Sequence, residues 1–229
     1  MPHFEPIGKV DCNFKEKFGI PRQPGLSPNS KAKIIMPRTR FNEDALKDLE
    51  GNNHLWIIFS FNKLKKIPDT ARVRPPRLGG NKYVGVYSSR SPYRPNPIGL
   101  SLVTFSHVSM HEKEIYLHIS NHDLLDGTPV VDIKPFVDSD RPNGEVTHSW
   151  QNKEWQNLIV SFTPEADSFV KNKQTLKQQI IEILQNDPRP AYHKKHNSKK
   201  INGLSLGDYN IKFCITEKDC SVLSVSLIE

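Results

Sequence analysis

Apolar residues in the first two-thirds of the chain fall into short runs that are rich in β-branched and aromatic side chains. The clearest run covers residues 54–61 (HLWIIFSF) and predicts a buried strand. Further strands are predicted at 30–36, 83–87, 100–108, 114–119 and 130–133. One short helix is predicted over 42–50, with Asn42 as its N-cap and Gly51 as its stop. This pattern predicts a mainly β body that extends to about residue 145.

The pattern of apolar positions changes near residue 160. Thr163-Pro164-Glu165 combines a capping hydroxyl, a proline and an acid, a combination that favours the start of a helix. Apolar side chains then recur at helical spacing, at Phe169, Leu176, Ile180 and Leu184. Residues 187–190 (DPRP) end this helix, and 209–216 and 221–228 predict a hairpin. We therefore expect a β domain over 1–145, a linker over 146–159 and a small α+β domain over 160–229.

Residues 72–99 follow neither pattern, because proline and glycine recur throughout them. Helix is nearly excluded by this proline spacing, and only 83–87 resembles a strand. Proline lowers the conformational entropy of the unfolded chain, so these loops should be well defined. Loops held on a rigid scaffold are where binding residues concentrate.

The bulk composition narrows the class of protein. The chain has 229 residues with 36% hydrophobic and 25% charged side chains, which indicates a globular protein. No apolar run reaches the roughly 20 residues of a membrane helix, and no signal peptide is visible, so a cytoplasmic protein is expected. The three cysteines form no CxxC pair, and the histidines have no metal-ligand spacing. We therefore expect neither disulfides nor a metal site.

Positive charge is concentrated in one part of the chain. The net charge is +7, and no Asp or Glu occurs between Thr70 and His111. That stretch carries Arg72, Arg74, Arg77, Lys82, Arg90 and Arg94. Because the guanidinium fork matches carboxylates and phosphates, an anionic partner such as nucleic acid is favoured.

Two local motifs have both a structural and a functional interpretation. Residues 91–99 (SPYRPNPIG) form either a rigid connection or a support that aims Arg90 and Arg94 at an anion, and the proline density favours function. The Asp126-Gly127 turn is either simple turn chemistry, which its spacing favours, or a backbone contact to a ligand. The chain has no GxGxxG and no phosphate-binding P-loop. A nucleotide-like cofactor would therefore bind on a β scaffold.

Several longer motifs identify a family. They are residues 18–24 (FGIPRQP), 54–56 (HLW), 74–81 (RPPRLGGN), 90–99 (RSPYRPNPIG), 125–135 (LDGTPVVDIKP) and 187–192 (DPRPAY). With these motifs the chain resembles the TsaA-like family, also called YaeB or TrmO, of tRNA (N6-threonylcarbamoyladenosine-37) N6-methyltransferases. The resemblance extends over nearly the whole chain.

The resemblance implies a single-sheeted β-barrel that binds S-adenosylmethionine (SAM), without the Rossmann fold of other methyltransferases. It also implies a homodimer, and a reaction on the anticodon loop of tRNA. Carried over by position, the cofactor contacts would be Pro21, Arg22, Gln23, Asn62, Lys63, Arg90, Leu100, Leu125, Asp126, Gly127 and Thr128. From charge and motif we expect tRNA contacts at Arg74, Arg77, Arg94, Arg189, Tyr192, Lys194 and Lys195.

The family pattern leaves the catalytic group open. Asp126 and Asp132 are candidates for accepting a proton, and solvent is another. Family members commonly have His where this chain has Asn62, and an amide cannot carry charge near neutral pH. We therefore favour a contact role for Asn62.

Two alternatives remain. The first is a non-catalytic RNA-binding β-barrel, which would stack bases on exposed aromatic rings. Trp56, Phe59, Phe61, Tyr83 and Tyr87 lie within strand patterns and are expected mainly in the core, which weighs against it. The second is a SAM-dependent methyltransferase that acts on another modified base or a small molecule.

Overall fold

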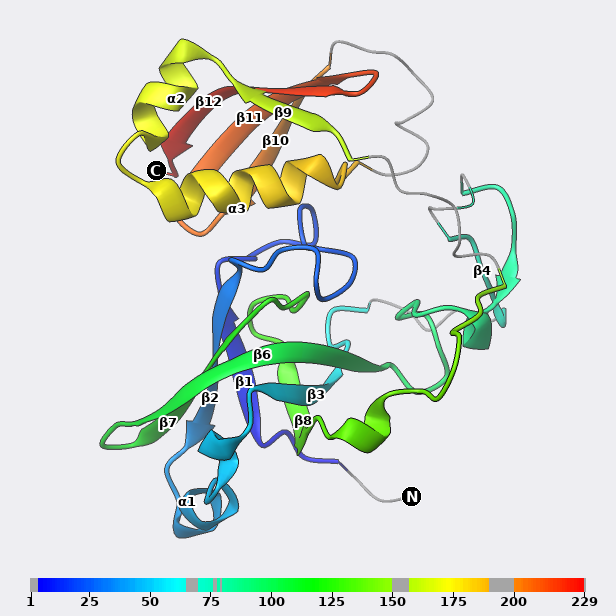
Figure 1. Cartoon of the computed structure of the whole chain (residues 1–229), viewed down its shortest axis with the longest axis vertical. Helices are drawn as coiled ribbons and strands as arrows, with labels where there is room; N and C mark the ends of the chain where they lie inside the picture. The colour runs from blue at the N-terminus through cyan, green and yellow to red at the C-terminus, as the bar shows by residue number, and fades with distance from the viewer. Residues whose placement is uncertain are drawn as a thin grey trace.

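The main body of the protein is an antiparallel barrel (Figure 1). The computed structural model describes residues 4–64, 70–75, 78, 80–149, 157–189 and 200–228. Within these residues, six strands close in the order β1-β2-β7-β6-β3-β8. They are β1 (Gly8–Cys12), β2 (Lys31–Pro37), β3 (His54–Ser60), β6 (Ile98–Met110), β7 (Glu114–Ser120) and β8 (Pro129–Pro135). The mainly β class predicted from the sequence is confirmed.

Alternating side chains fill the barrel. In β3 every second residue is buried, so Leu55, Ile57 and Phe59 point inward. The same alternation in β7 buries Ile115 and Leu117 completely. Because the strands close on themselves through the β1–β8 pairing, these apolar faces form one core.

Four of the described strands were not predicted from the sequence: β1, β4 (Arg72–Val73), β9 (Ile159–Phe162) and β10 (Ile201–Leu206). Each is short or interrupted by polar residues and glycine, so its own pattern is weak, and pairing with neighbours supplies the order. The strand predicted over 83–87 reduces to β5 (Val84–Gly85), followed by the 3-10 turn η3 (Val86–Ser88). Within the described residues β5 pairs with β4 alone, in an arm that extends beside the barrel (Figure 1).

Both predicted helices differ from the prediction. The first is α1 (Arg40–Ala45), followed by the 3-10 turn η1 (Leu49–Gly51), and its N-cap is Thr39 rather than Asn42. Asn42 instead lies inside the helix, where its side-chain amide donates to the Pro37 carbonyl at 2.7 Å. The second region contains two helices, α2 (Pro164–Val170) and α3 (Gln174–Gln185). The seven-residue step from Phe169 to Leu176 equals two helical turns, so hydrophobic spacing could not reveal the break.

The C-terminal part contains a second, smaller sheet with two helices. In the described residues its sheet has the order β10-β11-β12-β9, with β11 (Tyr209–Thr216) and β12 (Asp219–Leu227) forming the predicted hairpin. Thr163 caps α2 as predicted, because its hydroxyl accepts from the Ala166 amide. Figure 1 shows α3 between this sheet and the loops at one end of the barrel.

A buried glutamate joins the two units. Glu182 of α3 is 4% exposed, and its carboxylate accepts from the Ser27 hydroxyl at 2.9 Å and from the Asn29 amide nitrogens at 3.1 and 2.5 Å. Nearby, Phe18 stacks on Phe213 of β11 with ring centroids 6.4 Å apart. The C-terminal unit therefore holds the segment 13–30 in place against the barrel.

Candidate functional site

A cavity of about 560 Å³ lies where the segment 13–30 meets the end of the barrel. It is formed by the end of β3, the start of β6 and the loops at 17–22, 61–64, 89–94 and 123–128. Its volume is within the range of about 300–1,000 Å³ that is usual for small-molecule sites. These loops come from distant parts of the chain, so the barrel is what brings them together.

The cavity walls combine apolar and basic side chains. Phe59, Phe61, Tyr93, Leu100 and Leu125 provide apolar surface. The described lining also contains Lys17, Arg22, Lys63, Arg90 and Arg94 as cations, but Asp123 as its only acid. Such a site favours a ligand that has a flat or apolar part and carries negative charge.

Close packing shapes one wall of the cavity. Gly99 pairs with Phe59 across β6 and β3, and a Cβ at Gly99 would lie 2.2 Å from the ring atom Cζ of Phe59. Position 99 must therefore be a glycine, because the Phe59 ring packs directly against its backbone. The Phe59 ring in turn packs against Phe61, with centroids 5.0 Å apart. The sequence motif that ends in Gly99 thus fixes an aromatic wall.

The turn at 125–128 is held against β1. The backbone amide of Asp126 donates to Phe14 at 2.9 Å, and that of Gly127 donates to Val10 at 2.8 Å. Gly127 has a φ of +72°, a conformation that glycine adopts without strain. Asn62 donates its side-chain amide to the Gly127 carbonyl at 3.4 Å, which connects two segments predicted to bind the cofactor.

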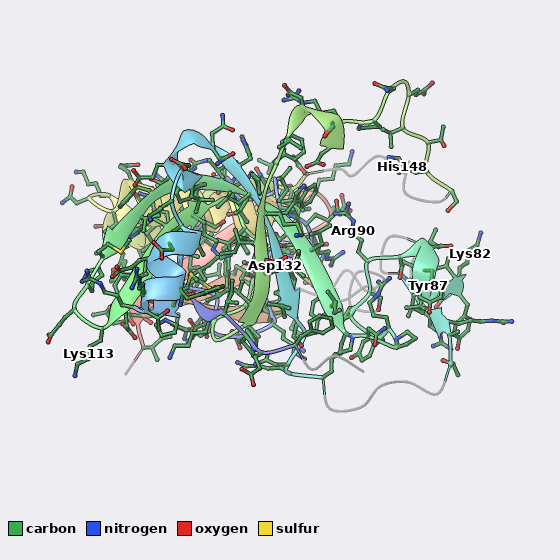
Figure 2. The ribbon with its side chains drawn as sticks, turned by 90° about the horizontal axis from the view of Figure 1, so that it is seen from below. Lys82, Tyr87, Arg90, Lys113, Asp132 and His148 are labelled. Atoms are coloured by element: carbon green, nitrogen blue, oxygen red, sulfur yellow. The ribbon has the colours of Figure 1, made fainter. Side chains whose placement is uncertain are left out.

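The structure brings most of the predicted cofactor contacts to one place. Eight of the eleven predicted contacts line the cavity, namely Pro21, Arg22, Asn62, Lys63, Arg90, Leu100, Leu125 and Thr128. Gln23, Asp126 and Gly127 belong to the same segments, but they are not among the lining residues. Figure 2 shows Arg90 where the barrel joins the arm.

The two carboxylates predicted as proton acceptors lie elsewhere. Asp126 accepts from the Cys12 backbone amide at 3.0 Å and pairs with Lys15 at 3.1 Å. Asp132 lies on β8, where it pairs with Lys134 at 3.1 Å. Neither lines the cavity. Both carboxylates already have partners that secure a turn or a strand.

Asp123 was missed because it is outside every motif that the sequence analysis singled out. It lines the cavity, and its carboxylate accepts from the buried hydroxyl of Ser101 at 2.5 Å. Burial raises the pKa of the Asp123 carboxyl, and the Ser101 hydrogen bond and the charge of Arg90 lower it in part. Asp123 lies two residues before the motif that begins at Leu125, and this proximity was the signal that could have found it.

The residues predicted to contact tRNA have different surroundings. Arg74 lies over the ring of Tyr83, with 4.3 Å from its guanidinium carbon to the ring centroid, and Arg94 donates to the Ser89 and Ser91 carbonyls at 3.2 Å. Arg189 is 9% exposed and pairs with Asp187. Arg77, Tyr192, Lys194 and Lys195 lie outside the described residues.

Two of the aromatic residues expected in the core are exposed. Tyr83 is 52% exposed and Tyr87 is 79% exposed, so the prediction for these two was wrong, whereas Phe59 is buried. Both tyrosines belong to the arm, where β4 and β5 pair only with each other and cover little surface. Figure 2 shows Tyr87 and Lys82 on this arm, away from the barrel.

The cysteines of the chain are free. Among the residues that the structure describes, no cluster of His, Cys, Asp or Glu could hold a metal ion. A search of the same residues finds no helix that is both long and apolar enough to cross a membrane.

A closed antiparallel barrel with a basic, aromatic-walled cavity at one end defines a class of β-barrel protein distinct from the alternating β-α nucleotide-binding folds. The chain belongs to the tRNA-methyltransferase O family. Residues 9–140 match the N-terminal domain of this family, and residues 155–228 match its C-terminal domain. The resemblance inferred from the motifs is confirmed.

Similar proteins extend over nearly the whole chain. The tRNA (adenine(37)-N6)-methyltransferase of Escherichia coli K12 is 39% identical over 231 residues, with 97% of both chains covered. A putative S-adenosylmethionine-dependent methyltransferase of Pseudomonas aeruginosa, RcsF, is 34% identical, with 90% of this chain and 89% of its own covered. A crystal structure of TrmO from Pseudomonas aeruginosa has a TM-score of 0.76 at 27% identity, with 99% of both chains covered.

Proposed function

We propose that this protein methylates N6 of adenosine 37 in tRNA with SAM as the methyl donor. The observation that carries the proposal is the match to the Escherichia coli tRNA (adenine(37)-N6)-methyltransferase across both domains. The finer proposal is that the target adenosine already carries the threonylcarbamoyl group. Because the proposed substrate is tRNA, we also propose that the protein acts in the cytoplasm. The proposed assembly is a homodimer, as the family resemblance implies.

The cavity residues fit the proposed cofactor. Phe59, Phe61 and Leu100 offer an apolar wall for an adenine ring, and Arg90 offers a guanidinium for the carboxylate of the amino-acid part. When bound, SAM supplies an electrophilic methyl group on a positively charged sulfur. The protein's own contribution is to hold the target nitrogen in line with that methyl group and to exclude water.

The arm supports a proposed surface for the anticodon loop. Tyr83 and Tyr87 are exposed, and cations from Arg74 and Arg94 lie near their rings, at 4.3 and 6.0 Å from the ring centroids. Unpaired bases stack on such rings, and phosphates pair with the arginines. The acid-free stretch of sequence therefore forms a surface suited to single-stranded RNA.

Replacing Tyr87 with alanine should weaken tRNA binding about tenfold, since stacking one base is worth roughly 1–3 kcal/mol. Phe41 is a matched control, because it is an aromatic residue that is 77% exposed but lies on α1, outside the arm. Phe41→Ala should leave the dissociation constant within a factor of two in a fluorescence titration. Equal losses in both variants would remove the arm from the tRNA surface.

The reaction itself is tested by nucleoside mass spectrometry. A tRNA that carries threonylcarbamoyladenosine 37 is incubated with the protein, with and without SAM, beside the same tRNA lacking the threonylcarbamoyl group. We expect one added methyl group on the modified nucleoside, only with SAM. Methylation of only the tRNA without the threonylcarbamoyl group would show that unmodified adenosine is the target. SAM binding without any methylation would favour another substrate. Absence of SAM binding would favour a non-catalytic RNA-binding barrel.

A further inference from the structure

Asp123 reaches the cavity because the segment after β7 is extended. In this segment alternate side chains point in opposite directions: His122 and Leu124 are each 1% exposed in the core, whereas Asp123 and Leu125 line the cavity. The His122 ring packs at 5.3 Å from the ring of Phe14, and Nδ1 accepts from the Leu124 amide, which fixes the register. The chain therefore directs one carboxylate into a site that is otherwise basic.

The surroundings of Asp123 leave the carboxylate poorly solvated, with one close hydroxyl donor. Ser101 of β6 is fully buried and donates its hydroxyl to Oδ1 at 2.5 Å. The described residues place no cation within ion-pair distance of Asp123, and Arg90 acts on it only through its charge. The other charged groups of the cavity are Lys17, Arg22, Lys63 and Arg94, and the neighbouring His122 is turned into the core. A carboxylate without a close cation can accept a proton.

The proposed reaction needs such a group. In threonylcarbamoyladenosine the target N6 is bonded to a carbonyl carbon, so its lone pair is delocalised and its N–H is more acidic than in adenosine. Methylation leaves a product without this proton, and a base near N6 must take it. Asp126 and Asp132 have partners elsewhere and do not line the cavity.

We propose that Asp123 is the catalytic base that removes the N6 proton in the reaction proposed above. The electrons of the N–H bond stay on nitrogen, and the proton moves to a carboxylate oxygen of Asp123. N6 forms a bond to the methyl carbon of SAM as the bond between that carbon and sulfur breaks. The electron pair of the broken bond stays on sulfur, which gives S-adenosylhomocysteine. The Asp123 carboxylic acid then releases its proton to solvent. This role rests on the proposed function.

Burial makes Asp123 a better base than an exposed aspartate. Desolvation raises its pKa above the usual value of 3.8, and the Ser101 hydrogen bond and Arg90 limit that rise. The single-turnover rate should therefore increase with pH up to the raised pKa and then level off. Removal of the Ser101 hydroxyl takes away a contact that favours the ionised form, so in Ser101→Ala the acid limb should move to higher pH.

Asp123→Asn is the decisive variant, because the amide keeps the shape and can still accept from Ser101 but cannot take the proton. We expect its single-turnover rate on the modified tRNA to fall about 100-fold or more, which is the usual size of a general-base effect. Calorimetric titration should show SAM and S-adenosylhomocysteine bound within threefold of the wild-type affinity. The acid limb of the pH profile should disappear.

A measurement without cofactor checks the assignment independently of activity. Carbon-13 NMR of the aspartate carboxyl carbons, assigned by comparison with Asp123→Asn, should show the Asp123 pKa raised in the free protein and raised further in Ser101→Ala. An unchanged rate in Asp123→Asn would overturn the proposal. So would a loss of SAM affinity equal to the loss of rate, since Asp123 would then hold the cofactor. A wild type that binds SAM and tRNA without methylating it would instead refute the proposed function itself.

Discussion

Replacing Arg189 with alanine should destabilise the protein by about 3 kcal/mol, because it removes the guanidinium that pairs with the buried Asp187 carboxylate. The guanidinium donates from Nε and Nη2 to the two oxygens of Asp187 at 2.9 and 3.1 Å, and both residues are less than 10% exposed. Breaking such a pair costs roughly 3–5 kcal/mol, and the remaining exposure favours the lower end. Urea denaturation of the whole chain measures the change.

The double variant Asp187→Ala with Arg189→Ala separates a buried charge from a tRNA contact. Because the double variant removes the buried carboxylate together with the guanidinium, it should be less destabilising than Arg189→Ala alone. Arg141→Ala is the matched control, because Arg141 is 72% exposed and pairs at 3.6 Å with a fully exposed Asp138. Its stability should change by less than about 0.5 kcal/mol. Weaker tRNA binding at unchanged stability in Arg189→Ala would contradict the structural role.

The pairing of Arg189 with Asp187 could not be predicted from the sequence. The motif at 187–190 was expected to stop a helix, and α3 does end at Gln185. A tRNA contact at Arg189 stays a prediction, and the structure adds that Arg189 pairs with Asp187, whose φ of +45° is left-handed. A positive φ at a non-glycine residue follows from tertiary packing, which the order of residues alone does not reveal.

Strands and helices with one buried face were predictable, because apolar residues recur at regular spacing along them. The alternation of β7 is visible in the sequence and matches its burial in the barrel, whereas β3 was predicted from its run of apolar and aromatic residues. The cavity is different, because Arg22, Asn62, Arg90 and Thr128 lie in loops without periodicity and were located through motifs. Asp123 had no motif, and only the direction of its extended segment shows that it points into the cavity.

The exposure of Tyr83 and Tyr87 has a related cause. The run 83–87 has the composition of a strand, but an aromatic residue is buried only if another layer covers it. In the arm, β5 has β4 as its partner and no layer of barrel strands over it. Tyr83 and Tyr87 therefore lie on the same exposed segment as arginines of the stretch that lacks Asp and Glu. Exposed rings beside arginines are what a surface for single-stranded RNA requires.

Replacing Arg90 with alanine should weaken SAM binding about 10- to 100-fold while leaving the fold intact. Arg90 lines the cavity, and the loss of one charge-assisted hydrogen bond to a carboxylate costs roughly 1.5–3 kcal/mol. Its side chain is exposed on a loop, so its removal should change the stability by less than about 0.5 kcal/mol. Calorimetric titration with SAM and thermal unfolding of the same sample measure both effects.

The choice of ligand shows which part of the cofactor Arg90 holds. S-adenosylhomocysteine keeps the carboxylate but lacks the sulfonium charge, so Arg90→Ala should weaken both ligands by the same factor. Arg72→Ala is the matched control, because Arg72 is an exposed arginine of β4 in the same acid-free stretch and does not line the cavity. Unchanged affinity in Arg90→Ala would remove Arg90 from the site. A loss confined to SAM would show that Arg90 acts on the surroundings of the sulfonium and does not hold the carboxylate of the ligand.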